Sequence, residues 1–310
     1  MSLVLWIAVP LIGLALLAGA AWLGIGWLGH WRLNRPPVST RPPDFTFTPW
    51  ETDAEHESVE FTTGDVRLHG WFLRHEGARR VVVVMHGYRG EKSDVLGMST
   101  ALWRAGFSVF LFDFRGRGRS AAAPFSMGYW ETADLGAALD WVEGRVPGAA
   151  IGLLGYSMGG VVAILGGGDP RVRAIVADSV FVSQREVLEH AARRDARRYL
   201  GRWVPGQAFV PAMEWWHRRS GKPGFDAIAP IERLAGLGET PLLLIHGTRD
   251  RWIPVDQARR LAAAAAPAPL CEAWLVDGAY HCGAYFVDRA AYCERVAAFF
   301  ERHLPAGEAA

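Results

Sequence analysis

The segment Gly155-Tyr156-Ser157-Met158-Gly159 carries the strongest chemical pattern in the chain. The apolar run 150–154 before it is long enough for a buried strand, and the apolar run 160–165 after it can continue as a buried helix. A Gly-x-Ser-x-Gly segment between a strand and a helix forms a sharp turn that exposes the serine hydroxyl above a sheet. Side chains at the two glycine positions would collide with the neighbouring strand and helix. The pattern therefore predicts that Ser157 is a nucleophile.

A serine hydroxyl needs a base to take its proton and an acid to orient that base. Asp250 follows the apolar run 242–245, and His281 follows the run that ends at Val276. Each residue comes after a different expected strand, so three loops can converge at one edge of a sheet. We expect His281 to be the base and Asp250 to orient it.

Other titratable residues leave alternatives open. Asp178 follows the short apolar run 174–177 and is the main alternative to Asp250 as the acid. His86 and His246 each precede a glycine at a strand end, and we interpret them as structural loop residues. We interpret His190, His217 and His303 as surface residues. Asp113 is interpreted as bracing the Arg-Gly turn that follows it rather than as catalytic.

A tetrahedral intermediate at a carbonyl carries an oxyanion that needs preorganised N–H donors. The backbone N–H of Met158, in the first turn after the serine, is one expected donor. The second is expected from the loop His86-Gly87-Tyr88-Arg89-Gly90, where we assign it to the N–H of Tyr88.

Strand and helix patterns alternate along most of the chain, which predicts a mainly parallel, doubly wound α/β sheet. The leading segments 58–62 and 66–75 alternate about Thr63-Gly64-Asp65 and predict a hairpin. The expected strands that follow are 81–85, 107–112, 149–154, 174–177, 241–245 and 271–276. One helix is expected to start near residue 93, and two others to span 131–143 and 255–265. A last helix is expected to present Tyr292, Val296 and Phe299 to the core.

Residues 183–226 interrupt this alternation and predict a helical cap inserted into an α/β domain of residues 58–304. The carboxyl ends of parallel strands are where ligands bind in open sheets, so four aromatic residues of the cap are candidates for substrate binding: Trp203, Phe209, Trp215 and Trp216. The segment carries nine basic and five acidic residues, a net +4 that suits either anionic lipid headgroups or a solvated basic face. The alternative is a solvated helical excursion with its own small aromatic core.

The segment 1–31 predicts a transmembrane anchor, because Leu3–Gly29 contains no charged residue and about 20 apolar residues span a bilayer. A cleaved signal peptide ending at Ala18-Gly19-Ala20 is the alternative, although no basic residue precedes the apolar run. Arg32, Arg35 and Arg41 follow the span and predict a single-pass protein with its catalytic domain on the cytoplasmic side.

The proline-rich segment 32–57 predicts an extended linker, and residues 305–310 form a short tail. The net charge of +1 argues against nucleic acid as a partner. The cysteines, Cys271, Cys282 and Cys293, show neither metal-ligand spacing nor the even number of a disulfide framework. With 50% hydrophobic residues the chain can build a large core.

Five motifs in order resemble the α/β-hydrolase superfamily over about residues 58–304: His86-Gly87, the Asp113-Phe114-Arg115-Gly116-Arg117-Gly118 turn, the serine turn, His246-Gly247 with Asp250, and Asp277-Gly278 before His281. Within that superfamily the chain looks most like anchored serine hydrolases of the Bem46-like type. The resemblance implies an eight-stranded sheet, acyl-enzyme chemistry with water as the usual acceptor, and no metal or organic cofactor.

Taken together, the sequence predicts a membrane-anchored serine hydrolase acting on a small-molecule or lipid-derived ester or thioester. A serine peptidase and an acyltransferase are alternatives on the same fold. A non-catalytic, membrane-tethered binding module is the alternative from a different class, although the serine, histidine and acid are all present.

Overall fold

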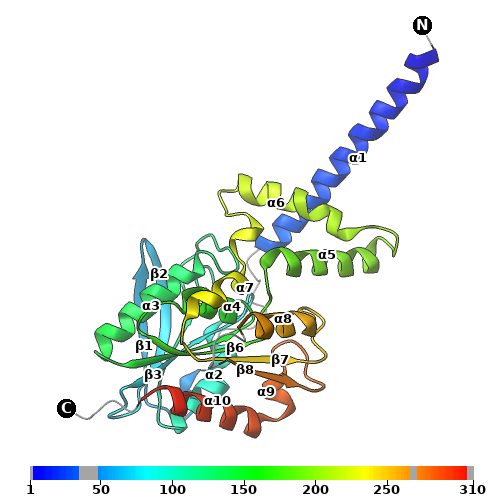
Figure 1. Ribbon diagram of the computed structural model, residues 1–310. Helices are drawn as coiled ribbons and strands as arrows, with labels where there is room; N and C mark the ends of the chain where they lie inside the picture. The colour runs from blue at the N-terminus through cyan, green and yellow to red at the C-terminus, as the bar shows by residue number, and fades with distance from the viewer. Residues whose placement is uncertain (1–2, 35–47, 266–270, 306–310) are drawn as a thin grey trace. The chain divides into compact units, whose positions relative to one another are not determined.

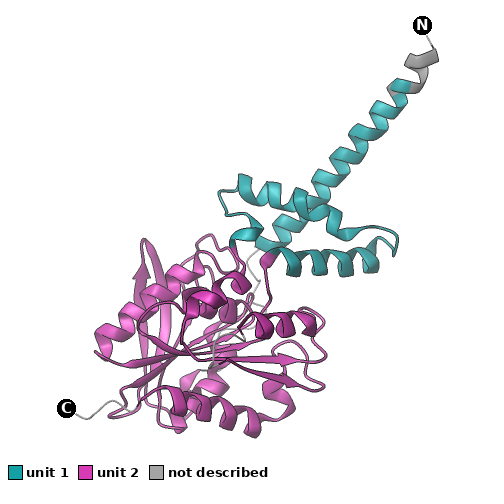
Figure 2. Cartoon of the chain, viewed as in Figure 1, with its two compact units in different colours: residues 1–35, 185–227 teal, residues 36–184, 228–310 magenta. Residues whose placement is uncertain are grey.

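The computed structural model describes residues 3–34, 48–265 and 271–305. The chain divides into two compact units (Figure 2): unit 1 comprises residues 1–35 and 185–227, and unit 2 comprises residues 36–184 and 228–310. Half of the predicted linker 32–57 and most of the tail 305–310 lie outside the described residues. The predicted domain boundaries stay a prediction.

Unit 2 is built on one eight-stranded sheet with the order β1-β2-β4-β3-β5-β6-β7-β8 (Figure 1). Only the pairs β1–β2 and β2–β4 are antiparallel. The strands are β1 His56–Thr63, β2 Val66–Leu73, β3 Arg80–Met85, β4 Ser108–Asp113, β5 Ala150–Tyr156, β6 Val172–Asp178, β7 Leu242–Gly247 and β8 Cys271–Val276. This arrangement confirms the predicted mostly parallel sheet, including its leading hairpin.

Helices cover both faces of the sheet, as a parallel sheet requires. The helices α2 Leu96–Arg104, α9 Ala284–Val287 and α10 Arg289–His303 lie on one face, and α3 Glu131–Arg145, α4 Met158–Gly166, α7 Pro230–Arg233 and α8 Val255–Ala265 lie on the other (Figure 1). The central strands are consequently buried on both sides, and the valines of β3 are fully inaccessible. The predicted core face of the closing helix is confirmed, because Tyr292, Val296 and Phe299 are all buried.

Unit 1 combines α1 Leu3–Asn34 with the inserted helices α5 Gln184–Tyr199 and α6 Val210–Arg219 (Figure 2). The indole of Trp216 donates a hydrogen bond to the Leu23 carbonyl at 3.0 Å. The indole of Trp22 donates to the Ala208 carbonyl at 2.7 Å. Gly26 lies so close to α6 that a Cβ there would overlap Ala212. The insertion therefore packs on the C-terminal part of α1 through α6 and the residues just before it.

The insertion begins and ends at almost the same point of unit 2. The Gln184 N–H donates a hydrogen bond to the Ile228 carbonyl at 2.8 Å. Both strands that flank the insertion, β6 and β7, are paired neighbours in the sheet. The 43-residue excursion 185–227 therefore leaves the register of the sheet undisturbed.

His217 is buried, although its sequence context suggests an exposed position. His217 reads as a surface residue of a basic helix, but it is buried, with its ring 5.7 Å from His30 and 4.9 Å from Phe225. The surface interpretation is wrong because the face of α6 that carries His217 is turned toward α1.

Candidate active site

Ser157 occupies a strained turn between β5 and α4. Its φ is +51° and its ψ is −114°, a backbone conformation that L-residues with a side chain rarely adopt. A Cβ at Gly159 would lie 2.5 Å from the Met85 carbonyl oxygen, and a Cβ at Gly155 would overlap the Gly159 backbone. The predicted need for glycine at both positions is confirmed. Tight packing between strand and helix thus holds the serine in its strained conformation.

The structure brings Ser157, His281 and Asp250 into one hydrogen-bonded chain. His281 Nε2 lies 3.0 Å from Ser157 Oγ, and His281 Nδ1 lies 2.6 Å from Asp250 Oδ2. The other oxygen of Asp250 accepts backbone N–H groups of Trp252 at 2.8 Å and Ile253 at 2.9 Å. Both carboxylate oxygens therefore have donors, which offsets the cost of burying the charge.

The hydrogen-bond partners of His281 show which of its ring nitrogens carries the proton. An ionised carboxylate only accepts hydrogen bonds, so the Nδ1–H of His281 donates to Asp250. In neutral His281 the Nε2 lone pair then faces the Ser157 hydroxyl. The side chain of Asp250 is fully buried, whereas that of His281 is 24% exposed. The imidazole can thus exchange a proton with a group entering from solvent.

Asp178, the alternative acid, forms no hydrogen bond with His281. Its carboxylate accepts hydrogen bonds from Tyr292 Oη at 2.9 Å and from Ser179 Oγ at 2.8 Å. Burial raises the pKa of Asp178 to about 6. The hydroxyl oxygen of Ser179 in turn accepts the Cys282 N–H at 2.9 Å. This chain links the end of β6 to the loop that carries His281.

Sequence reasoning missed Ser179 and Tyr292 as supports of the site. Tyr292 belongs to a helical core pattern, which gives no sign that its hydroxyl reaches a carboxylate. Ser179 directly follows a strand-ending aspartate and has φ +60°. A serine directly after the strand-ending aspartate is the one local sequence feature that could have indicated the link between Asp178 and the loop of His281.

The two residues predicted to supply oxyanion donors, Met158 and Tyr88, belong to segments that adjoin Ser157. Met158 is the first residue of α4, and the N–H groups of the first helical turn have no intrahelical partner. A Cβ at Gly87 would lie 3.5 Å from the Ser157 Cβ, so the loop carrying Tyr88 runs alongside the serine. The assignment of these two N–H groups as oxyanion donors stays a prediction.

His86 and His246 hold loops in place, consistent with their structural interpretation. His86 Nδ1 donates to the Gly87 carbonyl at 2.8 Å, and its Nε2 accepts the Phe114 N–H at 3.1 Å. His246 Nε2 donates to the Ile253 carbonyl at 2.9 Å. Burial lowers the pKa of both histidines, which keeps each ring neutral and able to make these bonds.

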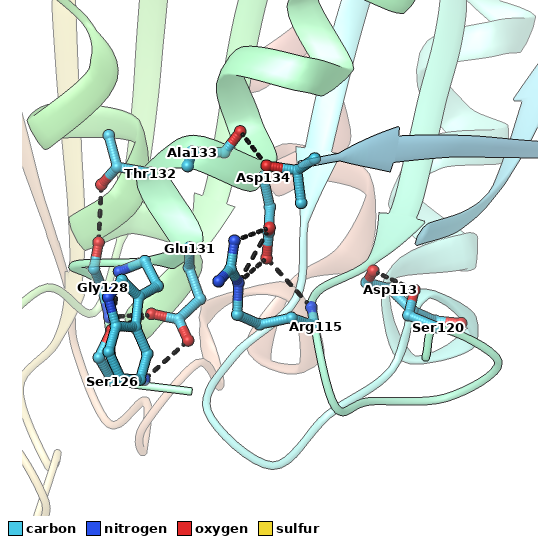
Figure 3. A network of polar contacts seen from close by, with 11 residues as sticks. Asp113, Arg115, Ser120, Ser126, Gly128, Glu131, Thr132, Ala133 and Asp134 are labelled. Atoms are coloured by element: carbon cyan, nitrogen blue, oxygen red, sulfur yellow. Dashed lines mark hydrogen bonds and ion pairs between the residues drawn. The ribbon is translucent and has the colours of Figure 1, made fainter. Parts of the chain in front are cut away.

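The turn after β4 is fixed by buried charges rather than left free for chemistry. Asp113 accepts hydrogen bonds from the Lys92 ammonium and from the Lys92 and Arg119 N–H groups. Ser120 donates from its hydroxyl to the Asp113 carbonyl at 2.6 Å (Figure 3). The interpretation of Asp113 as a brace for the Arg-Gly turn fits these contacts.

Two carboxylates of α3, those of Asp134 and Glu131, hold the start of this helix beside the turn (Figure 3). Arg115 forms a bidentate ion pair with Asp134, with the shortest contact at 2.6 Å. Burial nevertheless raises the pKa of Asp134 to about 6. Glu131 accepts N–H groups of Ser126 at 2.9 Å and Gly128 at 2.7 Å. These contacts fix the loop between β4 and α3, whose Phe125 ring packs 5.5 Å from that of Tyr88.

The four aromatic residues predicted to bind substrate, Trp203, Phe209, Trp215 and Trp216, all belong to unit 1. Their assignment stays a prediction. The indole of Trp216 is already engaged by α1, and Trp203 is 83% exposed. Within the described residues, no group of three or more His, Cys, Asp or Glu side chains is arranged to hold a metal ion.

The eight-stranded sheet and the serine turn between β5 and α4 define an α/β-hydrolase. The family described as "Serine aminopeptidase, S33" matches residues 76–212. Among solved structures, an esterase of Pyrococcus furiosus, Pf2001, is 26% identical with a TM-score of 0.72, covering 88% of this chain and 98% of that one. These findings confirm the predicted fold and an esterase-like hydrolase.

Two curated relatives share this similarity over 84% and 61% of this chain. The uncharacterized protein Rv2307c of Mycobacterium tuberculosis is 30% identical over 263 residues, covering 84% of this chain and 83% of the relative. The lysophosphatidylserine lipase ABHD12 of Macaca fascicularis is 25% identical over 195 residues, covering 61% of this chain and 46% of the relative. The chain belongs to the α/β-hydrolase superfamily, and its resemblance to the Bem46-like type is confirmed.

Proposed function

We propose that this protein is a membrane-anchored serine hydrolase that cleaves carboxylic ester or thioester bonds through Ser157, His281 and Asp250. The observation that carries the proposal is the continuous chain from Ser157 Oγ through both nitrogens of His281 to the buried Asp250 carboxylate. A structural serine has no need of such a chain, whereas a nucleophilic serine requires it.

In the proposed reaction, Ser157 Oγ attacks the substrate carbonyl carbon while its proton passes to His281 Nε2. The carbonyl oxygen becomes an oxyanion that the N–H groups of Met158 and Tyr88 bind. His281 then gives the proton to the departing alcohol or thiol, which leaves an acyl ester on Ser157. Water, deprotonated by the same imidazole, releases the acid and restores the serine. Asp250 stabilises the imidazolium that forms in both steps.

The membrane anchor is supported by the composition and exposure of α1. The helix from Pro10 to Asn34 is long enough to cross a bilayer and contains an 18-residue stretch with a mean hydropathy of 2.0. Its leucines 11, 14, 16 and 17 are 59–70% exposed. An exposed apolar surface of this length is stable in hydrocarbon but costly in water. The arginines after the span favour the cytoplasmic side for the hydrolase unit.

The proposed substrate class is based on the similarity to known hydrolases and on the proposed membrane anchor. The esterase Pf2001 and the lipase ABHD12 both take esters according to their names, which supports a small-molecule or lipid-derived ester. A serine peptidase is the second candidate, because the matching family is described as a serine aminopeptidase.

The proposal is tested by labelling the full chain with a fluorophosphonate, which reacts with an activated serine. Labelling should be present in the wild type, absent in Ser157→Ala and unchanged in Ser220→Ala, which alters an exposed serine of unit 1. Absence of labelling in the folded wild type would count against the enzyme and in favour of a binding module. Rates on p-nitrophenyl esters and on aminoacyl p-nitroanilides then separate the two candidates, and faster cleavage of the anilides would overturn the esterase assignment.

A further inference from the structure

The packing of the insertion on α1 sets its depth relative to a bilayer. An α-helix rises about 1.5 Å per residue, so the stretch from Leu3 to Trp22 is about 30 Å long, which equals the hydrocarbon thickness of a bilayer. The contacts with the insertion begin at Trp22 and Leu23 and continue through Gly26. If α1 spans the membrane, the insertion therefore lies at the level of the lipid headgroups.

The insertion carries a basic hollow on its surface. This hollow, of about 250 Å³, is lined by Arg193 and Arg197 of α5, by Arg202 and Trp203 after it, and by Val204, Pro205 and Gln207. Arg193 and Arg197 are four residues apart on one helix face, where like charges repel. Among the described residues, none of the three arginines forms an ion pair with a carboxylate. Three arginines thus line one hollow without a carboxylate partner in the described part of the chain.

Exposed apolar side chains lie next to these arginines in the chain. Tyr199, Leu200 and Trp203 are 64%, 52% and 83% exposed. The Arg202 guanidinium lies 4.5 Å from the centre of the Trp203 ring. Aromatic and aliphatic groups beside basic groups suit the boundary between headgroups and acyl chains. A free phosphate in solution has no apolar part that would cover this surface.

We propose that the hollow formed by Arg193, Arg197, Arg202 and Trp203 binds the phosphate of an anionic phospholipid headgroup. Guanidinium groups donate paired hydrogen bonds that match phosphate oxygens, and the apolar side chains beside them contact the glycerol and the first acyl carbons. The lipid is a bound neighbour of the anchor and is not consumed. The proposal rests on the membrane-anchored part of the proposed function and is independent of its chemistry.

The test uses the full chain in a neutral detergent, titrated with dioctanoyl phosphatidylglycerol or dioctanoyl phosphatidylcholine, with bound lipid counted by native mass spectrometry. We expect the wild type to retain phosphatidylglycerol preferentially. The triple variant Arg193→Gln, Arg197→Gln, Arg202→Gln should bind it about 100-fold more weakly, at roughly fivefold for each charge removed. A control variant with the same charge change in unit 2, Arg104→Gln, Arg233→Gln, Arg259→Gln, should bind it like the wild type.

Several results would overturn the proposal. Equal retention of the two lipids by the wild type, or equal loss of binding in the control, would show that the hollow does not recognise an anionic headgroup. Displacement of phosphatidylglycerol by an equal concentration of inorganic phosphate would assign the hollow to a soluble phosphate. Release of the protein from native membranes by carbonate would show that α1 does not span the membrane, and the proposal depends on that span. Fluorophosphonate labelling of the same samples reports separately on Ser157, so failure of the chemistry and failure of lipid binding are distinguishable.

Discussion

Replacing Asp250 by asparagine tests the orienting role assigned to this carboxylate. One oxygen of Asp250 accepts the Trp252 and Ile253 N–H groups, and an asparagine Oδ1 can keep both bonds. The amide NH2 then faces His281 Nδ1, which must become an acceptor. The proton of the neutral imidazole moves to Nε2, directly opposite the Ser157 hydroxyl, and the base is lost.

The size of the effect follows from that change of tautomer. The equivalent change in a serine protease lowers kcat about 10⁴-fold, which is about 5.5 kcal/mol of transition-state stabilisation. Because the side chain of Asp250 is fully buried, solvent cannot replace the lost orientation, and we expect a loss of 10³- to 10⁴-fold. The melting temperature should change little, since the two backbone contacts remain.

The assay is kcat on a p-nitrophenyl ester, with thermal unfolding of the same samples. Asp178→Asn is the matched control, because Asp178 is also buried but forms no hydrogen bond with His281. Its kcat should fall less than tenfold. A kcat within tenfold of wild type for Asp250→Asn, or a larger loss for Asp178→Asn, would refute the assignment of the acid.

Three further outcomes are expected. Gly159→Ala places its Cβ 2.5 Å from the carbonyl oxygen that ends β3, so it should destabilise the fold by about 2–4 kcal/mol in denaturant titrations. Gly136→Ala, in a helix with open space around it, should not be less stable than wild type. The pKa of Asp178 is raised in the folded state to about 6 from 3.8, so its contribution is present below pH 4 and is lost as pH rises through 6. Wild type should therefore lose about 3 kcal/mol relative to Asp178→Asn between those pH values, and parallel stability curves for the two proteins would contradict this. Trp216→Phe removes an indole donor to α1 and should lower the unfolding free energy in detergent by about 1 kcal/mol, whereas Trp215→Phe should change it less.

Much of the site could be predicted because parallel strands place their carboxyl ends at one edge of the sheet. Each of Ser157, Asp250 and His281 follows an apolar run that forms a strand, so sequence order alone brings their loops together. The runs themselves are recognisable because strands buried on both faces consist almost entirely of apolar residues.

Contacts between distant segments could not be predicted in the same way. Tyr292 fits a helical core pattern, and only the fold shows that its hydroxyl reaches Asp178 across more than a hundred residues. Likewise, nothing in the basic sequence around His217 indicates that an apolar N-terminal helix covers it. Such pairings depend on which elements are neighbours in space, and hydrophobic periodicity carries no information about that.

The single hydrogen bond that joins Gln184 to Ile228 has an evolutionary consequence. Because the excursion 185–227 leaves and re-enters unit 2 at almost the same point, it can be exchanged or shortened without altering the hydrolase core. The contact between Gly26 and Ala212 restricts this freedom from the opposite side. A bulkier residue at either position requires a compensating change in the other helix. α1 and the insertion are therefore expected to diverge together as one inherited part, at a pace independent of the sheet that carries the serine.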